Sequence, residues 1–178
     1  MKNVGRESET YLQYIITHYH ELPEVVVFTQ ARISDHKGQD DVQYLLDLKN
    51  QALRHSVSQN FLIHHDVGRD INWDKRWNVR PEGYYLKDNY KHNPIPFFDW
   101  FKTNIHPHYP NPIRIYSNAI FSVKRENILK HPLEDYKRWI TEVNHHSNSA
   151  EGHFFERSWY YIFNSPNRTR VHIRMQFT

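Results

Sequence analysis

The residues best suited to chemistry stand at the start of the chain, where a glycine and an arginine precede carboxylates and a patterned helix. Gly5 permits the positive φ angles or close backbone approach that a β-carbon prevents. Arg6 offers a planar fork of donors that suits a diphosphate or a carboxylate. The following helix turns unpaired N–H groups and the positive end of its dipole to the same place. The segment predicts an anion site, with a solvated surface turn as the alternative.

A second group of candidate residues lies on the last helix, whose apolar stripe comprises Phe155, Trp159, Ile162 and Phe163. Glu156 falls at the edge of this stripe, on an arc that it shares with His153 and Tyr160. A carboxylate half-buried against aromatic rings tends to have a raised pKa, which a general base near neutral pH needs. We expect Glu156 to act as such a base. The alternative is a structural ion pair with Arg157, Arg125 or another cation.

The middle of the chain holds two less specific features. His64-His65-Asp66 and Gly68-Arg69-Asp70 form a polar cluster, but adjacent histidines on a strand point to opposite faces, so at most one can join a given site. A long loop expected at 66–96 mixes aromatic and basic side chains. It suits a lid that stacks on sugar rings, a surface for single-stranded nucleic acid, or a minor aromatic core, which is the interpretation we favour.

Apolar spacing and turn residues predict the elements that position these residues. Helical spacing predicts helices at 11–22, 40–55, 97–104, 125–130, 133–143 and 151–163, the first capped by Ser8 or Thr10. Apolar runs predict strands at 25–29, 61–65, 113–116 and 119–123, and an alternating C-terminal strand at 166–178. The run Val25-Val26-Val27 is typical of a strand covered on both faces. We therefore expect a single α/β domain, 1–178, with a mostly parallel central sheet flanked by helices.

The C-terminal strand carries the most regular pattern in the chain. One parity is apolar and comprises Val171, Ile173, Met175 and Phe177. The other parity is polar and comprises Arg170, His172, Arg174 and Gln176. Strict alternation predicts a half-buried antiparallel or edge strand.

Composition narrows the class of protein. A chain of 178 residues has the length of one domain and can bury a core, and 15% aromatic residues make rings a large part of that core. The absence of cysteine excludes disulfides and thiolate metal sites. No apolar run has the length to span a bilayer, and the first residues do not form a signal peptide, so we expect a soluble, cytoplasmic protein. A formal charge of +3 is compatible with a phosphate-bearing partner.

Two blocks of sequence resemble an uncharacterised family. The first runs N-V-G-R-E, T-Y-L-Q-Y-I-I, L-P-E-V-V-V-F-T-Q and D-H, and the second runs A-I-F-S-V-K-R-E-N-I-L-K-H-P through E-G-H-F-F-E-R-S-W-Y-Y-I-F. The family looks like a branch of the nucleotide-sugar-dependent glycosyltransferases with the A-type fold, with relatives in fungi, bacteria and large DNA viruses. Its members usually carry a strand and a helix ahead of the first block. The resemblance therefore implies a truncated form of that fold here, or another element that supplies the strand.

The resemblance implies roles for residues of the first block. Gly5, Arg6 and the helix start would hold the diphosphate of the donor, and Asn3 and Glu7 would contact its ribose or base. Glu156 would be the base, since these transferases commonly carry it on a late helix or loop. The donor site would lie across the carboxyl ends of the strands.

A metal site follows less directly from the resemblance. These transferases often bind a divalent cation, Mn²⁺ or Mg²⁺, through an Asp-x-Asp segment, which this chain lacks. Asp35 and His36 match the family's Asp-His pair and could serve as ligands together with His153. Alternatively Arg32, where the family has an acidic residue nearby, could neutralise the diphosphate without a metal.

The function expected from the resemblance is transfer of a sugar from a nucleotide-diphosphate donor to a glycan or glycoprotein acceptor in a viral or host cytosol. Two alternatives stay open. One is a nucleic-acid-binding or metal-dependent nuclease module built on the His64–Asp70 cluster, although the mild charge makes nucleic acid an unlikely partner. The other is a non-catalytic remnant of the transferase family.

Overall fold

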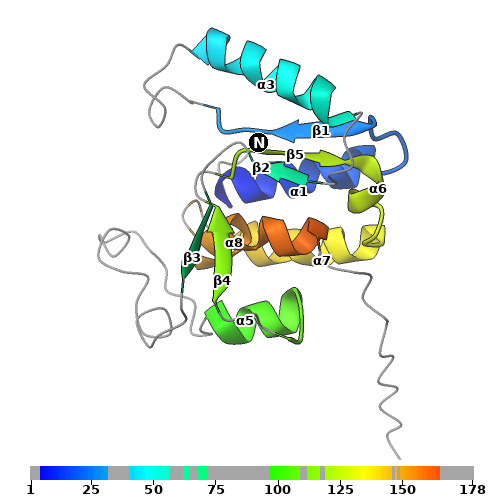
Figure 1. Ribbon diagram of the computed structural model, residues 1–178. Helices are drawn as coiled ribbons and strands as arrows, with labels where there is room; N and C mark the ends of the chain where they lie inside the picture. Colours follow the sequence, from blue (N-terminus) through cyan, green and yellow to red (C-terminus); the bar gives the residue numbers. More distant parts are fainter. Residues whose placement is uncertain are drawn as a thin grey trace, which may run out of the picture.

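The computed structural model of the protein describes residues 5–31, 41–56, 62–64, 68–71, 97–108, 112–116, 119–145, 147 and 149–164. These residues form a mixed α/β arrangement in which two small sheets pack among helices (Figure 1). The mixed class agrees with the expectation from the sequence. The expected C-terminal strand at 166–178 and most of the expected 66–96 loop lie outside the described residues.

The larger sheet has the strand order β1-β5-β2, formed by β1 (Val25–Phe28), β5 (Phe121–Lys124) and β2 (Leu62–His64). Both pairings are antiparallel, with Val26 opposite Val123 and Leu62 also opposite Val123. The second sheet pairs β3 (Gly68–Ile71) with β4 (Ile113–Tyr116), again antiparallel. β3 is thus a strand within the stretch that the sequence predicted to be a loop.

The expectation of a mostly parallel sheet with the Val25–Thr29 strand at its centre is wrong for the described strands. Every described pairing is antiparallel, and β1 stands at the end of its sheet. Helices cover both faces of β1, because α1 (Arg6–His18) packs on one face through Tyr11 and Tyr14 against Phe28, and α3 (Asp41–Ser56) packs on the other. A run of β-branched residues indicates that both faces of a strand are buried. It does not indicate whether another strand pairs with each of its edges.

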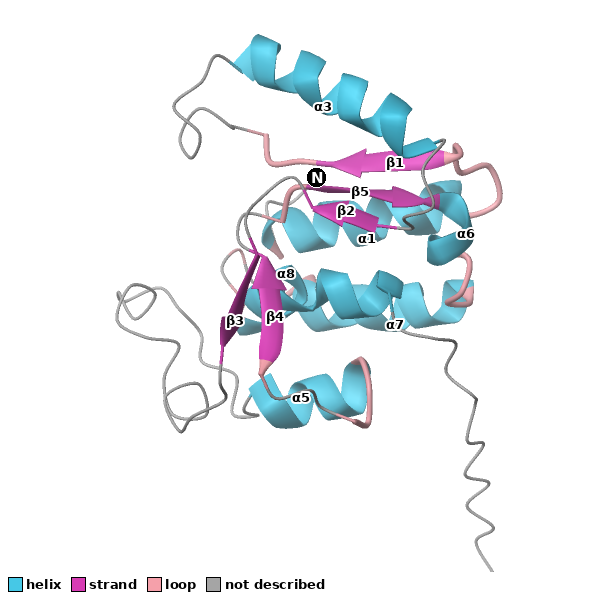
Figure 2. Cartoon of the chain, in the orientation of Figure 1, coloured by secondary structure: helices cyan, strands magenta, loops and turns pink. Residues whose placement is uncertain are grey.

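The main core lies on the α1 side of the sheet, between α1, α7 (Leu133–Val143) and α8 (Ala150–Asn164) (Figure 2). It is built largely from aromatic rings, as the composition predicted. Fully buried tryptophans come from three helices, since α5 (Phe97–Asn104) contributes Trp100, α7 Trp139 and α8 Trp159. Edge-to-face ring pairs join different helices, such as Trp139 of α7 with Phe155 of α8 and Trp100 of α5 with the same Phe155.

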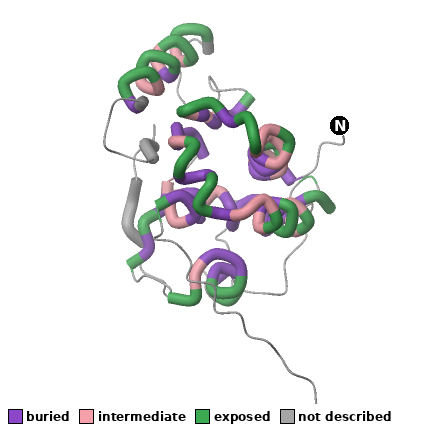
Figure 3. Tube along the Cα trace, turned by 90° about the vertical axis from the view of Figure 1, so that its right-hand side faces the viewer, coloured by how far each residue is buried: buried purple, intermediate pink, exposed green. Residues whose placement is uncertain are grey.

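A smaller core lies on the opposite face of the sheet, under α3. Leu48 of α3 packs with Ile120, next to Val27 and Tyr44. The buried ring of His55 also bonds to the hydroxyl of Ser122 on β5, with 2.8 Å between Nδ1 and Oγ. Most of α3 is nevertheless exposed, as the helix at the top of Figure 3 shows.

Several predicted boundaries moved. The first helix begins at Arg6 instead of residue 11, and neither Ser8 nor Thr10 caps it, because Gly5 occupies the cap position without a side-chain hydrogen bond. The remaining predicted helices agree to within two residues, and they are α3, α5, α6 (Arg125–Ile128), α7 and α8. None of the helices in the described ranges is long and apolar enough to cross a lipid bilayer.

Candidate functional site

Helix α1 begins on a backbone with two successive left-handed residues. Gly5 has φ 68°, and Arg6 has φ 57°. The left-handed region is routine for glycine, but a residue with a β-carbon is destabilised there by roughly 1–2 kcal/mol. Sparsely populated backbone conformations cluster at active sites and ligand clamps. The conformation of Arg6 therefore marks the start of α1 as a candidate site, independently of residue type.

Two glycines allow the start of α1 to touch its neighbours. A β-carbon on Gly5 would lie 2.7 Å from the carbonyl oxygen of Val143 at the end of α7. A β-carbon on Gly152, in the first turn of α8, would lie 3.2 Å from the carbonyl oxygen of Gly5. The hydroxyl of Ser8 donates to the carbonyl of Gly152 at 3.0 Å, and the N–H of Gly152 donates to the hydroxyl of Ser149 at 3.1 Å. The first turns of α1 and α8 are thus locked together.

This contact assembles Arg6, His153 and Glu156 into one cluster. Nη1 of Arg6 lies 2.7 Å from Nε2 and 3.2 Å from Nδ1 of His153. Nδ1 of His153 lies 3.6 Å from Oε2 of Glu156, and Nε of Arg6 lies 3.4 Å from Oε2 of Glu7. His153 is buried, whereas the side chains of Arg6 and Glu156 are 29% and 22% exposed. A guanidinium and a carboxylate therefore reach solvent with a buried imidazole between them.

The imidazole of His153 is neutral near pH 7. Burial lowers its pKa, and the charges of Arg6 and Arg157 lower it further against the opposing effect of Glu156. A guanidinium can only donate, so the nearer nitrogen, Nε2, is the acceptor from Arg6. This assigns the proton to Nδ1, beside Glu156. The neutral ring therefore links the cation to the carboxylate.

The pKa of Glu156 is lowered, so the raised pKa expected from the sequence is wrong. Burial pushes the pKa upward, but the N–H of His153 and the charges of Arg157, His153 and Arg6 outweigh it. Arg157, whose Nη1 donates to the carbonyl of His153 at 2.7 Å, contributes through its charge. The helical wheel located Glu156 correctly at the edge of the core. It could not reveal that Arg6 also acts on the carboxylate, because Arg6 comes from the far end of the chain.

The donor set of the described residues suits an anion better than a divalent cation. His153 and Glu156 are two metal-type ligands, but the guanidinium 2.7 Å from His153 would repel a cation. No group of three histidine, cysteine, aspartate or glutamate side chains with metal-binding geometry occurs within the described ranges. The predicted site residues Asn3, Arg32, Asp35 and His36 lie outside the described residues.

A hollow of about 360 Å³ follows α1 away from this cluster. It lies between α1 and β1, and its lining includes Thr10, Tyr11, Tyr14 and Phe28. The pKa of Tyr11 is raised, chiefly by burial and also by the negative charges of Glu7 and Glu156. Tyr11, whose pKa responds to the charges of Glu7 and Glu156, is one of the residues that line the hollow. Neither Tyr11 nor Tyr14 was among the predicted site residues, although their positions one and two helical turns after Glu7 indicated that they share its face of the helix.

The other predicted residues play structural parts where they are described. Arg125, a candidate partner of Glu156, instead donates to the carbonyl of Leu22 at 3.1 Å. Tyr160 packs its ring 5.5 Å from that of Tyr116. The backbone of His64 lies in β2 and that of Arg69 in β3, two different sheets, so the predicted polar cluster spans both of them.

Comparison with known proteins establishes the family. Residues 1–175 match the family described as a protein of unknown function, DUF3431. The chain belongs to this family. No curated protein and no solved structure matched the chain.

Proposed function

We propose that the protein is a glycosyltransferase that moves a sugar from a nucleotide-diphosphate donor to a hydroxyl group of a glycan or glycoprotein. The observation that carries the proposal is the cluster of Arg6, His153 and Glu156 at the start of α1. The cluster brings together the two sequence blocks that carry the resemblance to the A-type glycosyltransferases. Arg6 and His153 stand 147 positions apart in the chain. Residues so distant in sequence meet here as a guanidinium, an imidazole and a carboxylate.

The donor's diphosphate would bind to Arg6 and the N-terminus of α1. Gly5 provides no side-chain cap to the helix, so its first N–H groups and its dipole favour an anion at this end. Neutral His153 accepts from Arg6 and orients its guanidinium. The nucleoside would extend along α1 into the aromatic hollow with Tyr11 and Tyr14, whose volume of about 360 Å³ is within the range of small-molecule sites.

Glu156 would take the proton from the acceptor in an inverting transfer. The acceptor oxygen attacks the anomeric carbon of the sugar while its proton passes to the carboxylate of Glu156. The bond between the anomeric carbon and the diphosphate oxygen breaks, and Arg6 stabilises the negative charge that develops on the leaving group. The lowered pKa keeps Glu156 in the basic form at neutral pH, at the cost of some basicity. The donor set of the described residues does not fit a divalent cation, so this step is assigned to Arg6 and Glu156 alone.

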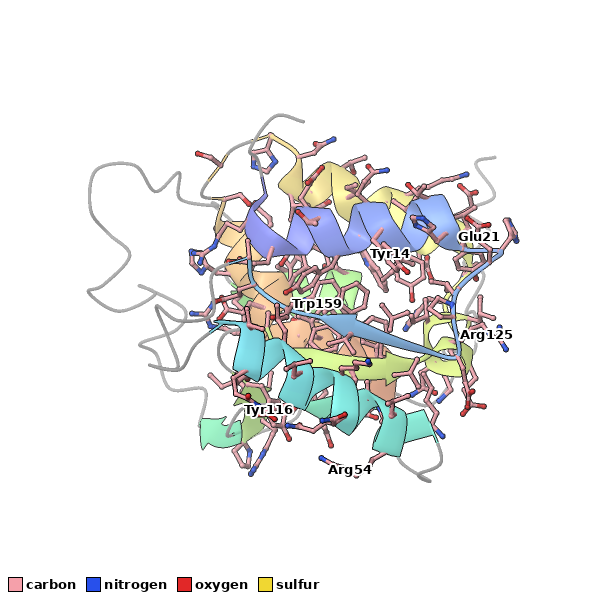
Figure 4. The ribbon with its side chains drawn as sticks, turned by 90° about the horizontal axis from the view of Figure 1, so that it is seen from above. Tyr14, Glu21, Arg54, Tyr116, Arg125 and Trp159 are labelled. Atoms are coloured by element: carbon pink, nitrogen blue, oxygen red, sulfur yellow. The ribbon has the colours of Figure 1, made fainter. Side chains whose placement is uncertain are left out.

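Donor binding tests this proposal directly. Isothermal titration calorimetry with nucleotide sugars that differ in base and sugar should reveal at least one ligand of the unaltered protein. Arg6→Ala should weaken that binding by about 1.5–3 kcal/mol, the value of a hydrogen bond to a charged group, or roughly 10- to 150-fold in Kd. Arg54→Ala is the matched control, because it removes the same charge from an exposed position on α3 (Figure 4).

Two results would overturn the proposal. One is the absence of binding by every nucleotide sugar, with and without Mn²⁺. The other is equal affinity of folded Arg6→Ala and Arg54→Ala for a donor that does bind. Repeating the titration with Mn²⁺ and with a chelator also tests whether Asp35 and His36 hold a metal.

A further inference from the structure

Helix α3 carries more apolar surface than the sheet beneath it covers. Its inward face holds Tyr44, Leu48 and His55, which pack toward the sheet. Four of the five large apolar side chains that are exposed within the described ranges lie on this helix, with exposed fractions of 47–66%, and they are Val42, Leu45, Leu46 and Leu53. Single apolar residues on a surface are ordinary, but a contiguous apolar patch usually marks an interaction site.

These four side chains are contiguous on the helix. With 3.6 residues per turn, they occupy an arc of about 100° directly beside the inward face. Lys49, which is exposed, falls in the middle of this arc. Arg54 falls on the other side of the helix, away from β1 (Figure 4). The arc is therefore an apolar patch with one cation at its centre.

The patch continues into a hollow of about 580 Å³ between α3 and β1. From the helix, its lining includes Leu45, Lys49 and Leu53. From the other side it includes Val27 and Glu24, the residue just before β1. Within the part of the chain that the structure describes, neither Lys49 nor Glu24 forms an ion pair. The hollow thus holds one charge of each sign on largely apolar walls.

We propose that the α3 patch and this hollow form the interface of a homodimer with two-fold symmetry. In such an interface the same surface of both copies meets, so every contact occurs twice. Lys49 of one copy then faces the hollow that contains Glu24 of the second copy, and the reciprocal pair forms across the axis. Leu45 and Leu53 of both copies are removed from water.

Charge favours a second copy over a lipid surface as the occupant. A cation in the middle of an apolar arc is costly to bury unless a carboxylate meets it. The second copy supplies that carboxylate as Glu24, whereas an anionic bilayer that attracts Lys49 would repel Glu24. The patch is therefore complementary to itself. Because it is small, we expect a dissociation constant in the micromolar range.

The dimer is compatible with the proposed donor site and does not depend on it. The interface lies on the α3 face of β1. The hollow proposed for the nucleoside, with Thr10 and Tyr14, lies on the α1 face. None of the residues of the patch belongs to the cluster around Arg6, so the two proposals can fail separately.

Sedimentation velocity over a concentration series of the full-length protein tests the dimer. The unaltered protein should change from monomer to dimer between micromolar and near-millimolar concentration. Lys49→Glu and Glu24→Lys should each raise the Kd at least about tenfold, because each puts like charges together at both reciprocal pairs. Arg54→Glu is the matched control, since it reverses a charge at an exposed position on the other side of α3, and it should leave the Kd unchanged.

An equimolar mixture of the two charge-reversal variants gives the sharpest measurement. The Lys49→Glu chain presents two carboxylates at this surface, and the Glu24→Lys chain presents two ammonium groups. Opposite charges therefore meet at both pairs only when the two different chains associate. We expect the mixture to form a heterodimer at concentrations where each variant alone is monomeric.

Leu53→Lys tests the apolar part of the interface. The side chain is 62% exposed, so its replacement should leave the fold intact, as circular dichroism checks for every variant. Association should nevertheless be lost, because the new ammonium group would be buried among apolar side chains.

Four outcomes would refute the homodimer. They are an unaltered protein that stays monomeric at near-millimolar concentration, a dimer that survives Leu53→Lys, a dimer that Arg54→Glu weakens as much as Lys49→Glu does, and a mixture of folded charge-reversal variants that stays monomeric. Vesicles of phosphatidylcholine and phosphatidylserine identify the other occupant. A monomeric protein that co-sediments with them, and no longer does so after Leu53→Lys, would assign the patch to a lipid surface instead.

Discussion

Replacement of Gly5 by alanine should destabilise the protein more than any other single methyl added near the site. The β-carbon would face the left-handed φ of 68°, which is unfavourable by roughly 1–2 kcal/mol for a residue with a side chain. It would also lie 2.7 Å from the carbonyl oxygen of Val143, and relieving such overpacking typically costs about 1–3 kcal/mol. The two effects together lower the free energy of unfolding by roughly 2–5 kcal/mol, equivalent to a fall in Tm of about 4–20 °C for a chain of this size.

The matched variant is Gly152→Ala, on the other side of the same contact. Its β-carbon would lie 3.2 Å from the carbonyl oxygen of Gly5, a tight contact, but alanine in a helix gains about 1 kcal/mol over glycine. We expect a change of at most about 1 kcal/mol in either direction. Urea denaturation followed by tryptophan fluorescence measures both variants. Equal stability of Gly5→Ala and the unaltered protein would refute the role assigned to the left-handed turn at the start of α1.

Four further predictions concern the side chains of the site. Arg6→Gly should be more stable than Arg6→Ala by about 1–2 kcal/mol, because Arg6 also has a left-handed φ of 57°; equal stabilities would count against backbone strain there. Glu156→Gln should reduce turnover per folded molecule by about 10²–10⁴-fold in a sugar-transfer assay, and full turnover would exclude Glu156 as the base. The lowered pKa of His153 stabilises the fold above the unfolded pKa of about 6.5, and this contribution disappears as the pH falls through the folded pKa. The difference in unfolding free energy between the unaltered protein and His153→Gln should therefore shrink from pH 7 to pH 5, and a growing difference would contradict the assignment. Tyr11→Phe should cost about 0.5–1.5 kcal/mol in urea denaturation, since the hydroxyl donates to the carbonyl of Ala119 at 3.2 Å, and an unchanged midpoint would mean that this bond contributes nothing.

The sequence by itself determined most of the element types. Apolar periodicity predicted the bounds of α3, α5, α7 and α8 to within two residues. Each of these helices buries an apolar stripe, and the residues of that stripe recur at helical spacing within the helix's own sequence. Residue types also singled out Arg6, Glu156 and His153, which meet in the structure.

Only the tertiary structure decided the strand order, the start of α1 and the protonation of the site. β1 is as apolar as a central strand because helices cover both of its faces. Its side-chain pattern does not indicate whether a second strand pairs with the backbone along its other edge, and in the described sheet β1 is an end strand. Helix α1 begins at Arg6 because Gly5 fits against Val143, a residue from the other end of the chain. Glu156 has a lowered pKa because His153 and Arg157 of α8 lie beside its carboxylate and Arg6 of α1 adds its charge across the contact between the two helices. A pKa depends on the distances between charges in space, and spacing along the chain does not contain those distances.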